Sequence, residues 1–126
     1  MNTIYILRLK KIADFYIYER ISEPNMLDNL KNLFEEISGD EKNYINYIKK
    51  GTNISGNQIY TDQRNGKIYL GNIYASDYPD PNEFEIPTAT LITLIEKFVQ
   101  LAQLEPPYIV LSEENGVFSL EAKEII

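Results

Sequence analysis

Two Asn-Gly pairs, each between two strand-like stretches, constrain the fold of this chain more than any other feature. The pairs are Asn65-Gly66 and Asn115-Gly116. Both residue types tolerate the positive φ that a two-residue hairpin turn requires. The strand-like stretches around the two pairs are residues 58–61, 67–74, 108–111 and 117–120. Two such signals in one short chain predict an antiparallel sheet.

The remaining elements follow from the spacing of apolar residues. Residues 3–9 and 15–21 are rich in β-branched and aromatic side chains, which favours two strands. Apolar residues at helical spacing predict helices over 24–38, 40–50 and 87–105, and residues 84–86 form a candidate short strand. The expected fold is α+β, with a mostly antiparallel sheet, two or three helices packed on it, and the order ββ-α-α-ββ-α-ββ.

Composition limits the chemistry that the chain can perform. At 126 residues, of which 44% are hydrophobic, the chain has the size of one domain, so residues 1–126 are expected to fold as a single domain. There is no cysteine, which excludes disulfides and thiolate nucleophiles. There is also no histidine, which removes the usual general base and the commonest transition-metal ligand.

The first residues do not resemble a secretion signal. Met1, Asn2 and Thr3 precede an apolar run that Arg8 interrupts, with no basic leader and no small-residue cleavage site. That run is also too short to span a bilayer. We therefore expect a cytoplasmic protein.

Charge is distributed unevenly along the chain. Residues 1–67 carry ten Lys and Arg against nine Asp and Glu, whereas residues 68–126 carry two Lys against ten acids. The second half thus has a net charge of −8 and the whole chain −7. Such a surface repels nucleic acid and anionic membrane and attracts basic proteins. We expect a basic protein partner, no nucleic acid and no membrane.

An acidic segment over residues 77–85 is the first candidate for the contact. It alternates carboxylates with aromatic residues and is stiffened by two prolines, an arrangement that suits a binding loop. The tyrosines beside it would add rigid, amphipathic contact area. An ordinary solvated loop is the alternative interpretation. The candidate partner-binding residues are Tyr69, Tyr74, Asp77, Tyr78, Asp80, Glu83, Phe84 and Glu85.

The same segment does not have the pattern of a metal site. The alternating Asp-x-Asp-x-Asp-Gly spacing of a calcium loop is absent, and Pro79 and Pro81 restrict the wrapping that such a site requires. Adjacent acids elsewhere, such as Glu113 and Glu114, do not place carboxyl groups across a substrate. The sequence predicts no cofactor, no metal ion and no catalytic residue.

The C-terminal half of this small, acidic chain runs through a strand over 66–71, an Asp/Pro/Glu loop, Phe84-Glu85-Ile86-Pro87 opening an apolar helix, and Pro106-Pro107-Tyr108 before the last hairpin. In size, acidity and this succession it resembles the cytoplasmic immunity proteins of bacterial polymorphic-toxin and contact-dependent inhibition systems. The resemblance implies that an acidic surface covers the basic catalytic or substrate groove of a cognate toxin, often a nuclease.

Three classes of function remain open on the sequence. The first is an inhibitor or immunity protein that is a monomer or weak dimer when free. The second is a non-catalytic adaptor or assembly subunit that acts through helix contacts or through a sheet edge, such as residues 3–9. The third is an enzyme, which would need a concave pocket holding two or more acids with raised pKa values.

Overall fold

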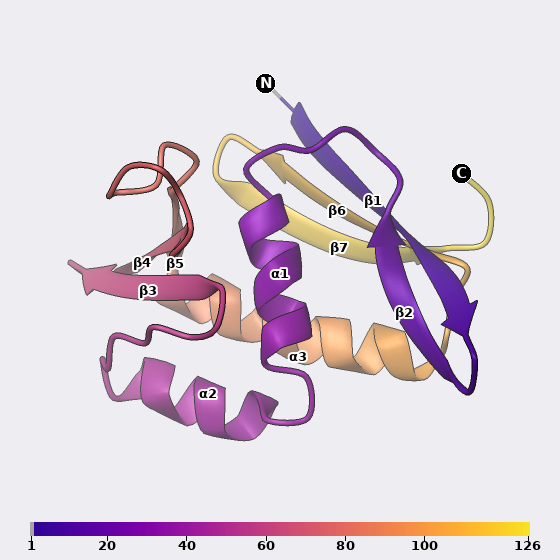
Figure 1. Cartoon of the computed structure of the whole chain (residues 1–126), viewed down its shortest axis with the longest axis horizontal. Helices are drawn as coiled ribbons and strands as arrows, with labels where there is room; N and C mark the ends of the chain where they lie inside the picture. Colours follow the sequence, from indigo (N-terminus) through magenta and orange to yellow (C-terminus); the bar gives the residue numbers. More distant parts are fainter. Residues whose placement is uncertain (1) are drawn as a thin grey trace.

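The computed structural model describes residues 2–126, which form an α+β fold with two antiparallel sheets and three helices (Figure 1). The order of elements is ββ-α-α-βββ-α-ββ. Their bounds are β1 Asn2–Ile12, β2 Phe15–Arg20, α1 Asp28–Glu36, α2 Glu41–Lys49, β3 Ile59–Arg64, β4 Lys67–Asn72, β5 Phe84–Pro87, α3 Thr88–Gln103, β6 Tyr108–Glu114 and β7 Val117–Lys123.

The four-stranded sheet joins the two ends of the chain. Its strand order is β2-β1-β6-β7, and all neighbouring strands are antiparallel. In β1, Leu7 lies between Arg20 of β2 and Ile109 of β6. Because side chains alternate along a strand, Tyr5 and Leu7 point into the core while their neighbours point to the other face.

The three-stranded sheet has the order β3-β4-β5. The turn between β3 and β4 contains Asn65 and Gly66, with φ angles of 53° and 78°. Asn115 and Gly116 have φ angles of 53° and 81° between β6 and β7. Both predicted Asn-Gly hairpins are therefore confirmed.

The antiparallel α+β prediction is confirmed, and the structure adds two details to it. Its strands form two separate sheets, and the short stretch before Pro87 becomes a third strand, with Ile86 paired to Ile68 of β4. The alternation of apolar and polar residues along a strand shows which of its faces is buried, but it does not show which other strand pairs with it. The sequence alone therefore could not divide the strands between the sheets.

The first helix begins later than the proline signal predicted. A turn at Met26 and Leu27 precedes it, in which Asn25 Oδ1 accepts a hydrogen bond from Leu27 N at 2.9 Å and Asn25 O accepts one from Asp28 N at 3.0 Å. Leu27 is fully buried even though it precedes the helix. Because Leu27 is apolar, it continued the helical spacing of apolar residues in the sequence, so the predicted helix began before the observed one.

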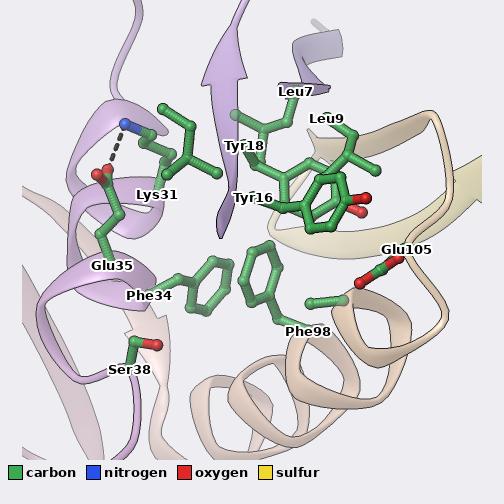
Figure 2. A pocket seen from close by; sticks show the side chains of 12 residues that line it. Leu7, Leu9, Tyr16, Tyr18, Lys31, Phe34, Glu35, Ser38, Phe98 and Glu105 are labelled. Carbon is green, nitrogen blue, oxygen red and sulfur yellow. Dashed lines mark ion pairs between the residues drawn. The ribbon is translucent and has the colours of Figure 1, made fainter. Parts of the chain in front are cut away.

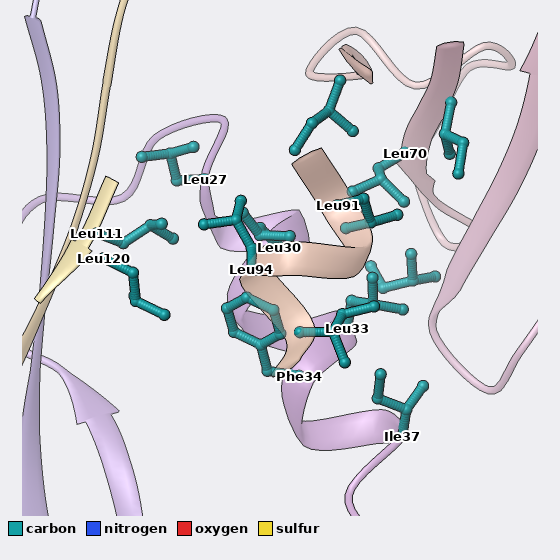
Figure 3. Close-up of a cluster of buried hydrophobic side chains, with 14 of the residues drawn as sticks. Leu27, Leu30, Leu33, Phe34, Ile37, Leu70, Leu91, Leu94, Leu111 and Leu120 are labelled. Carbon is teal, nitrogen blue, oxygen red and sulfur yellow. The ribbon is translucent and has the colours of Figure 1, made fainter. Parts of the chain in front are cut away.

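The core lies around α3, between the two sheets. Leu91, Leu94 and Ile95 of α3 belong to one buried cluster that also includes Leu70 of the three-stranded sheet and Leu120 of the four-stranded sheet (Figure 3). Helix α1 adds Leu30, Leu33 and Phe34 to the same cluster. Among residues 2–126, no helix is long and apolar enough to cross a membrane.

Replacing Ile95 by alanine tests whether both sheets depend on α3. We expect the free energy of unfolding to fall by about 2–4 kcal/mol, because the truncation leaves a cavity in a shared core. Urea unfolding, followed by circular dichroism and by tyrosine fluorescence, should still show one transition. The matched control is Gln100→Ala on the exposed face of α3, for which we expect a change within about 0.5 kcal/mol. Two separate transitions in the Ile95→Ala variant would show that the sheets unfold independently.

Candidate functional site

The acidic loop, defined here as residues 73–83 between β4 and β5, is anchored by a buried carboxylate. Asp80 Oδ2 accepts hydrogen bonds from Asn72 N at 2.8 Å and from Asn29 Nδ2 of α1 at 3.2 Å, and Oδ1 accepts one from Asn82 N at 2.9 Å. Burial alone would raise the pKa of the Asp80 carboxyl, but these three donors outweigh it and hold that pKa below its usual value.

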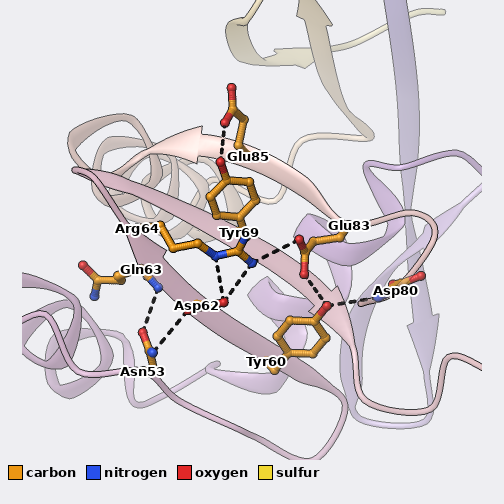
Figure 4. Close-up of polar contacts among 9 residues, drawn as sticks. All are labelled: Asn53, Tyr60, Asp62, Gln63, Arg64, Tyr69, Asp80, Glu83 and Glu85. Atoms are coloured by element: carbon orange, nitrogen blue, oxygen red, sulfur yellow. Dashed lines mark hydrogen bonds and ion pairs between the residues drawn. The ribbon is translucent and has the colours of Figure 1, made fainter. Parts of the chain in front are cut away.

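A second anchor is Tyr60 of β3, whose ring lies over Gly71 of β4. A Cβ atom at position 71 would come within 2.2 Å of the Tyr60 ring, so only glycine leaves room for it. The Tyr60 hydroxyl donates to the Glu83 carboxylate and accepts a hydrogen bond from Asp80 N at 3.2 Å (Figure 4). Burial, together with the hydrogen bond to Glu83, raises the pKa of Tyr60 to about 12.

Arg64 neutralises part of the acidic surface from within the same sheet. Its guanidinium contacts Asp62 Oδ2 at 2.8 Å and Glu83 Oε1 at 3.4 Å, and lies 3.9 Å from the centre of the Tyr69 ring (Figure 4). The Tyr69 hydroxyl in turn donates to Glu85 Oε2 at 2.8 Å. Together with Lys67 this hydrogen bond lowers the pKa of the Glu85 carboxyl.

The tip of the loop remains available to a partner. Tyr74 and Tyr78 expose 76% and 78% of their surface, and Asp77 lies between them in sequence. The Tyr78 ring lies 5.4 Å from that of Tyr60, which supports its base. Within residues 2–126, the Asp77 side chain forms no ion pair and no hydrogen bond.

Two hollows lie beside this tip, and neither is lined by a lysine or an arginine. The first has a volume of about 430 Å³ and includes Asp62, Asp77 and Tyr78 among its walls. The second, of about 330 Å³, holds the carboxylates of Asp28 and Asp80. Its other polar walls are Asn25, Asn29, Asn32, Asn72, Ser76 and Asn82. Asp28 is paired with Arg20 at 3.6 Å, Asp62 with Arg64 at 2.8 Å, and Asp80 is hydrogen-bonded within the chain. Asp77 is therefore the carboxylate of these hollows that, within residues 2–126, is left to the ammonium or guanidinium group of a partner.

A larger hollow on the other side of the molecule has different chemistry. It measures about 510 Å³ and lies between β2 and the helices α1 and α3 (Figure 2). Phe34 and Phe98 stack there with ring centres 4.5 Å apart, and Lys31 forms an ion pair with Glu35. The Tyr18 hydroxyl donates to Pro106 O at 2.9 Å. Its walls are mostly apolar and its Glu35 carboxylate is already paired with Lys31, so it is less suited to a basic partner.

The structure gives different positions to the residues that the sequence proposed for partner binding. Phe84 is only 8% exposed and packs against Phe118, with ring centres 6.0 Å apart, so its side chain belongs to the core. Asp80 also points inward. Glu85 and Tyr69 lie on the surface of the three-stranded sheet, whereas Glu83 ends the acidic loop and exposes only 10% of its side chain. Each of the three has an internal partner.

Other residues of the site were absent from the sequence prediction, namely Asp62 and Arg64 of β3 and Asn29 of α1. Tyr60 was predicted only as one of the tyrosines beside the acidic segment, without a contact to the loop. An aromatic residue on one strand beside a strand with a glycine was a usable signal for the pair formed by Tyr60 and Gly71. No local pattern marks Asn29, because its contact with Asp80 depends on tertiary structure.

No protein-family model matches this chain, and no curated protein or solved structure matches it either. In the part of the chain described here, no group of three or more Asp, Glu, His and Cys side chains is arranged to hold a metal ion. What the site can do therefore follows from its own oxygen-rich hollows and exposed tyrosines.

Replacing Asp80 by asparagine should loosen the acidic loop. An amide cannot accept from all three donors, so we expect a loss of about 1–3 kcal/mol in the free energy of unfolding at neutral pH. Because the folded-state pKa is lowered, this stabilisation is present above the unfolded pKa of about 4 and is lost as pH falls through the folded pKa.

Urea unfolding of both proteins from neutral to acidic pH measures this dependence. The difference between wild type and Asp80→Asn should stay constant near neutral pH and shrink in acid. The control is Asp77→Asn, because that carboxylate lacks an internal partner. A difference that did not change with pH would contradict the assigned role of Asp80.

A double-mutant cycle tests the contact between Tyr60 and Gly71. Gly71→Ala should destabilise the protein by about 1–3 kcal/mol, because the new methyl group displaces the Tyr60 ring. In a Tyr60→Ala background the same change should cost much less, since the obstructing ring is gone. Equal costs in both backgrounds, measured by urea unfolding, would rule out this contact as the reason for the glycine.

Proposed function

We propose that this protein binds and neutralises a basic protein partner, by placing its acidic loop against the basic surface of that partner. The observation that carries the proposal is the loop tip, where Asp77 lies in sequence between the exposed Tyr74 and Tyr78 and has no ion pair or hydrogen bond within residues 2–126. Asp77 lines a hollow of about 430 Å³, which has room for the end of a lysine or arginine side chain.

A toxin with a nuclease groove is the partner class that fits this surface best. A groove that holds phosphate must be positively charged, and an acidic protein is steered towards it by long-range attraction. The resemblance of the C-terminal half to cytoplasmic immunity proteins supports the same class. The proposed action is inhibition by occupation of the groove.

Tight inhibition requires more than charge. A nanomolar complex corresponds to about −12 kcal/mol, which exposed ion pairs do not supply. Tyr74 and Tyr78 offer exposed aromatic area beside the hollows, and Tyr78 is supported from below by Tyr60. We therefore assign them as the anchors of the interface, with Asp77 as the charged contact.

Binding without catalysis is part of the proposal. The carboxylates of Asp80, Glu83 and Glu85 are engaged in hydrogen bonds or ion pairs within the chain. Of these, Asp80 and Glu85 have lowered pKa values, whereas a general acid needs a raised one. These observations support an inhibitor over an enzyme.

A growth assay with a captured partner tests the proposed function. Proteins held by the immobilised chain at low salt and released at high salt are identified by mass. Each basic candidate is then expressed alone and together with the chain. A partner that stops growth alone and is harmless when co-expressed would support the proposal. If no captured protein is toxic, or if co-expression does not protect, the proposal is wrong.

Substitutions at the loop tip then locate the contact. Tyr78→Ala should weaken binding at least tenfold through lost anchor area, and Asp77→Asn should slow association and reduce its dependence on salt. The matched control is Glu121→Gln on β7, an exposed acid away from the loop. Surface plasmon resonance at two salt concentrations gives both rates. Equal effects of Asp77→Asn and Glu121→Gln would exclude the loop as the electrostatic contact.

A further inference from the structure

The outer face of the four-stranded sheet carries an apolar surface that no other element of the chain covers completely. Along β1 and β6 every second side chain points into the core, and Leu7 and Leu111 on that side are fully buried. The side chains that alternate with them point away from the core. The apolar members of this outer face are Ile4, Ile6, Ile12, Phe15, Ile17, Val110 and Val117, with Ile21 next to Ile6 at the end of β2.

Several of these side chains are substantially exposed. Phe15 exposes 56% of its surface and Ile4 47%, and they lie towards opposite ends of the face. Ile21 donates its backbone N–H to Ile6 O at 3.0 Å, which aligns its side chain with the row formed by Ile6 and Val110. Contiguous apolar area of this kind marks an interaction surface.

The charge of this face differs from that of the rest of the protein. The strand registers place three basic side chains on it, Arg8, Lys10 and Lys123, and three acidic ones, Glu19, Glu114 and Glu121. The whole chain has a net charge of −7. A neutral face is therefore the place where two copies of an acidic protein approach with the least repulsion, whereas a basic partner gains little there.

The charges also follow an order that a two-fold axis can match. The central row across the sheet reads Glu19, Arg8, Tyr108 and Lys123 from β2 to β7. Suppose that two copies pack face to face about a two-fold axis parallel to the strands. The strand order of the second copy then runs in the opposite direction across the interface, so this row of four residues faces the same row in reverse order. Glu19, which pairs with Arg8 at 2.7 Å and with Lys10 at 3.5 Å in its own chain, then also faces Lys123 of the second copy, and Arg8 faces its Tyr108.

We propose that two copies of this chain associate through the outer faces of their four-stranded sheets, with Ile6 of each copy packed against Val110 of the other. Two antiparallel sheets pack in this way in β-sandwiches, at a separation of about 10 Å. The loop tip at Asp77 and Tyr78 lies outside this face, so the dimer does not depend on the proposed inhibition of a toxin.

The size of the face sets the expected strength. Four strands about 4.8 Å apart, with about seven residues each at 3.3 Å, span roughly 450 Å² in projection. A standard interface buries about 800 Å² per partner. The dimer therefore falls at the small end of specific interfaces, and we expect a weak, reversible association.

Sedimentation equilibrium from low to high micromolar concentration tests the proposal on the purified chain. The wild type should change from monomer to dimer over this range. Ile6→Lys should raise the dissociation constant at least tenfold, because two buried charges would face apolar side chains. The matched control is Leu104→Lys, an equally drastic change at an exposed leucine at the end of α3, which should leave the dimer intact.

A cross-linking experiment tests the proposed dimer without relying on the Ile6→Lys variant, whose substitution could also lower the stability of the fold. Because the chain has no cysteine, a single Ile6→Cys variant carries one thiol. A short bismaleimide should then give a covalent dimer, whereas Leu104→Cys should stay monomeric. A wild type that remains monomeric at high micromolar concentration would overturn the proposal. So would a dimer unaffected by Ile6→Lys, or cross-linking that is equal at both positions.

Discussion

Packing of one face of α3 against two sheets is the constraint on which the rest of this molecule depends. Neither sheet has a second layer of its own, so each covers its inner face with the same helix and with α1. The buried face of α3 therefore serves two surfaces at once, which explains why its apolar stripe is wide. The sheets gain a fixed relative position from this shared contact, although no hydrogen-bonded strand pairing among residues 2–126 joins them.

That fixed position also builds the candidate site. Asn29 belongs to the helix that packs beneath the three-stranded sheet, and it reaches Asp80 of the loop that follows β4. Tyr60 reaches the same loop from the sheet itself. The tip of the loop is thus held from two directions, while Tyr74 and Tyr78 stay at the surface. Binding surfaces of this kind lose little conformational entropy on association.

The sequence predicts local structure well here because local signals agree with the final packing. The Asn-Gly turns, the helix stripes and the proline before α3 each identify an element from neighbouring residues alone.

What could not be predicted depends on contacts between distant residues. Phe84 looked like an exposed anchor because it stands among acids, yet Ile86 and Phe84 alternate with Glu85, which places both apolar side chains on the buried face of β5. Asp80 looked like a free charge because the sequence does not show that three donors surround it. The order of strands within the sheets is likewise invisible to periodicity.

The position of β1 in the four-stranded sheet has a consequence for how the protein acquires its structure. β1 lies in the interior of that sheet, but its partner β6 comes from the far end of the chain, as the pairing of Tyr5 with Leu111 shows. During synthesis β1 and β2 can pair at once, whereas the other edge of β1 stays open until β6 leaves the ribosome. Pairings between residues so distant in sequence form slowly, and an open strand edge invites association with other chains in the meantime. The nascent protein thus passes through an interval in which one edge of β1 is unprotected, until the hairpin of β6 and β7 emerges and covers it.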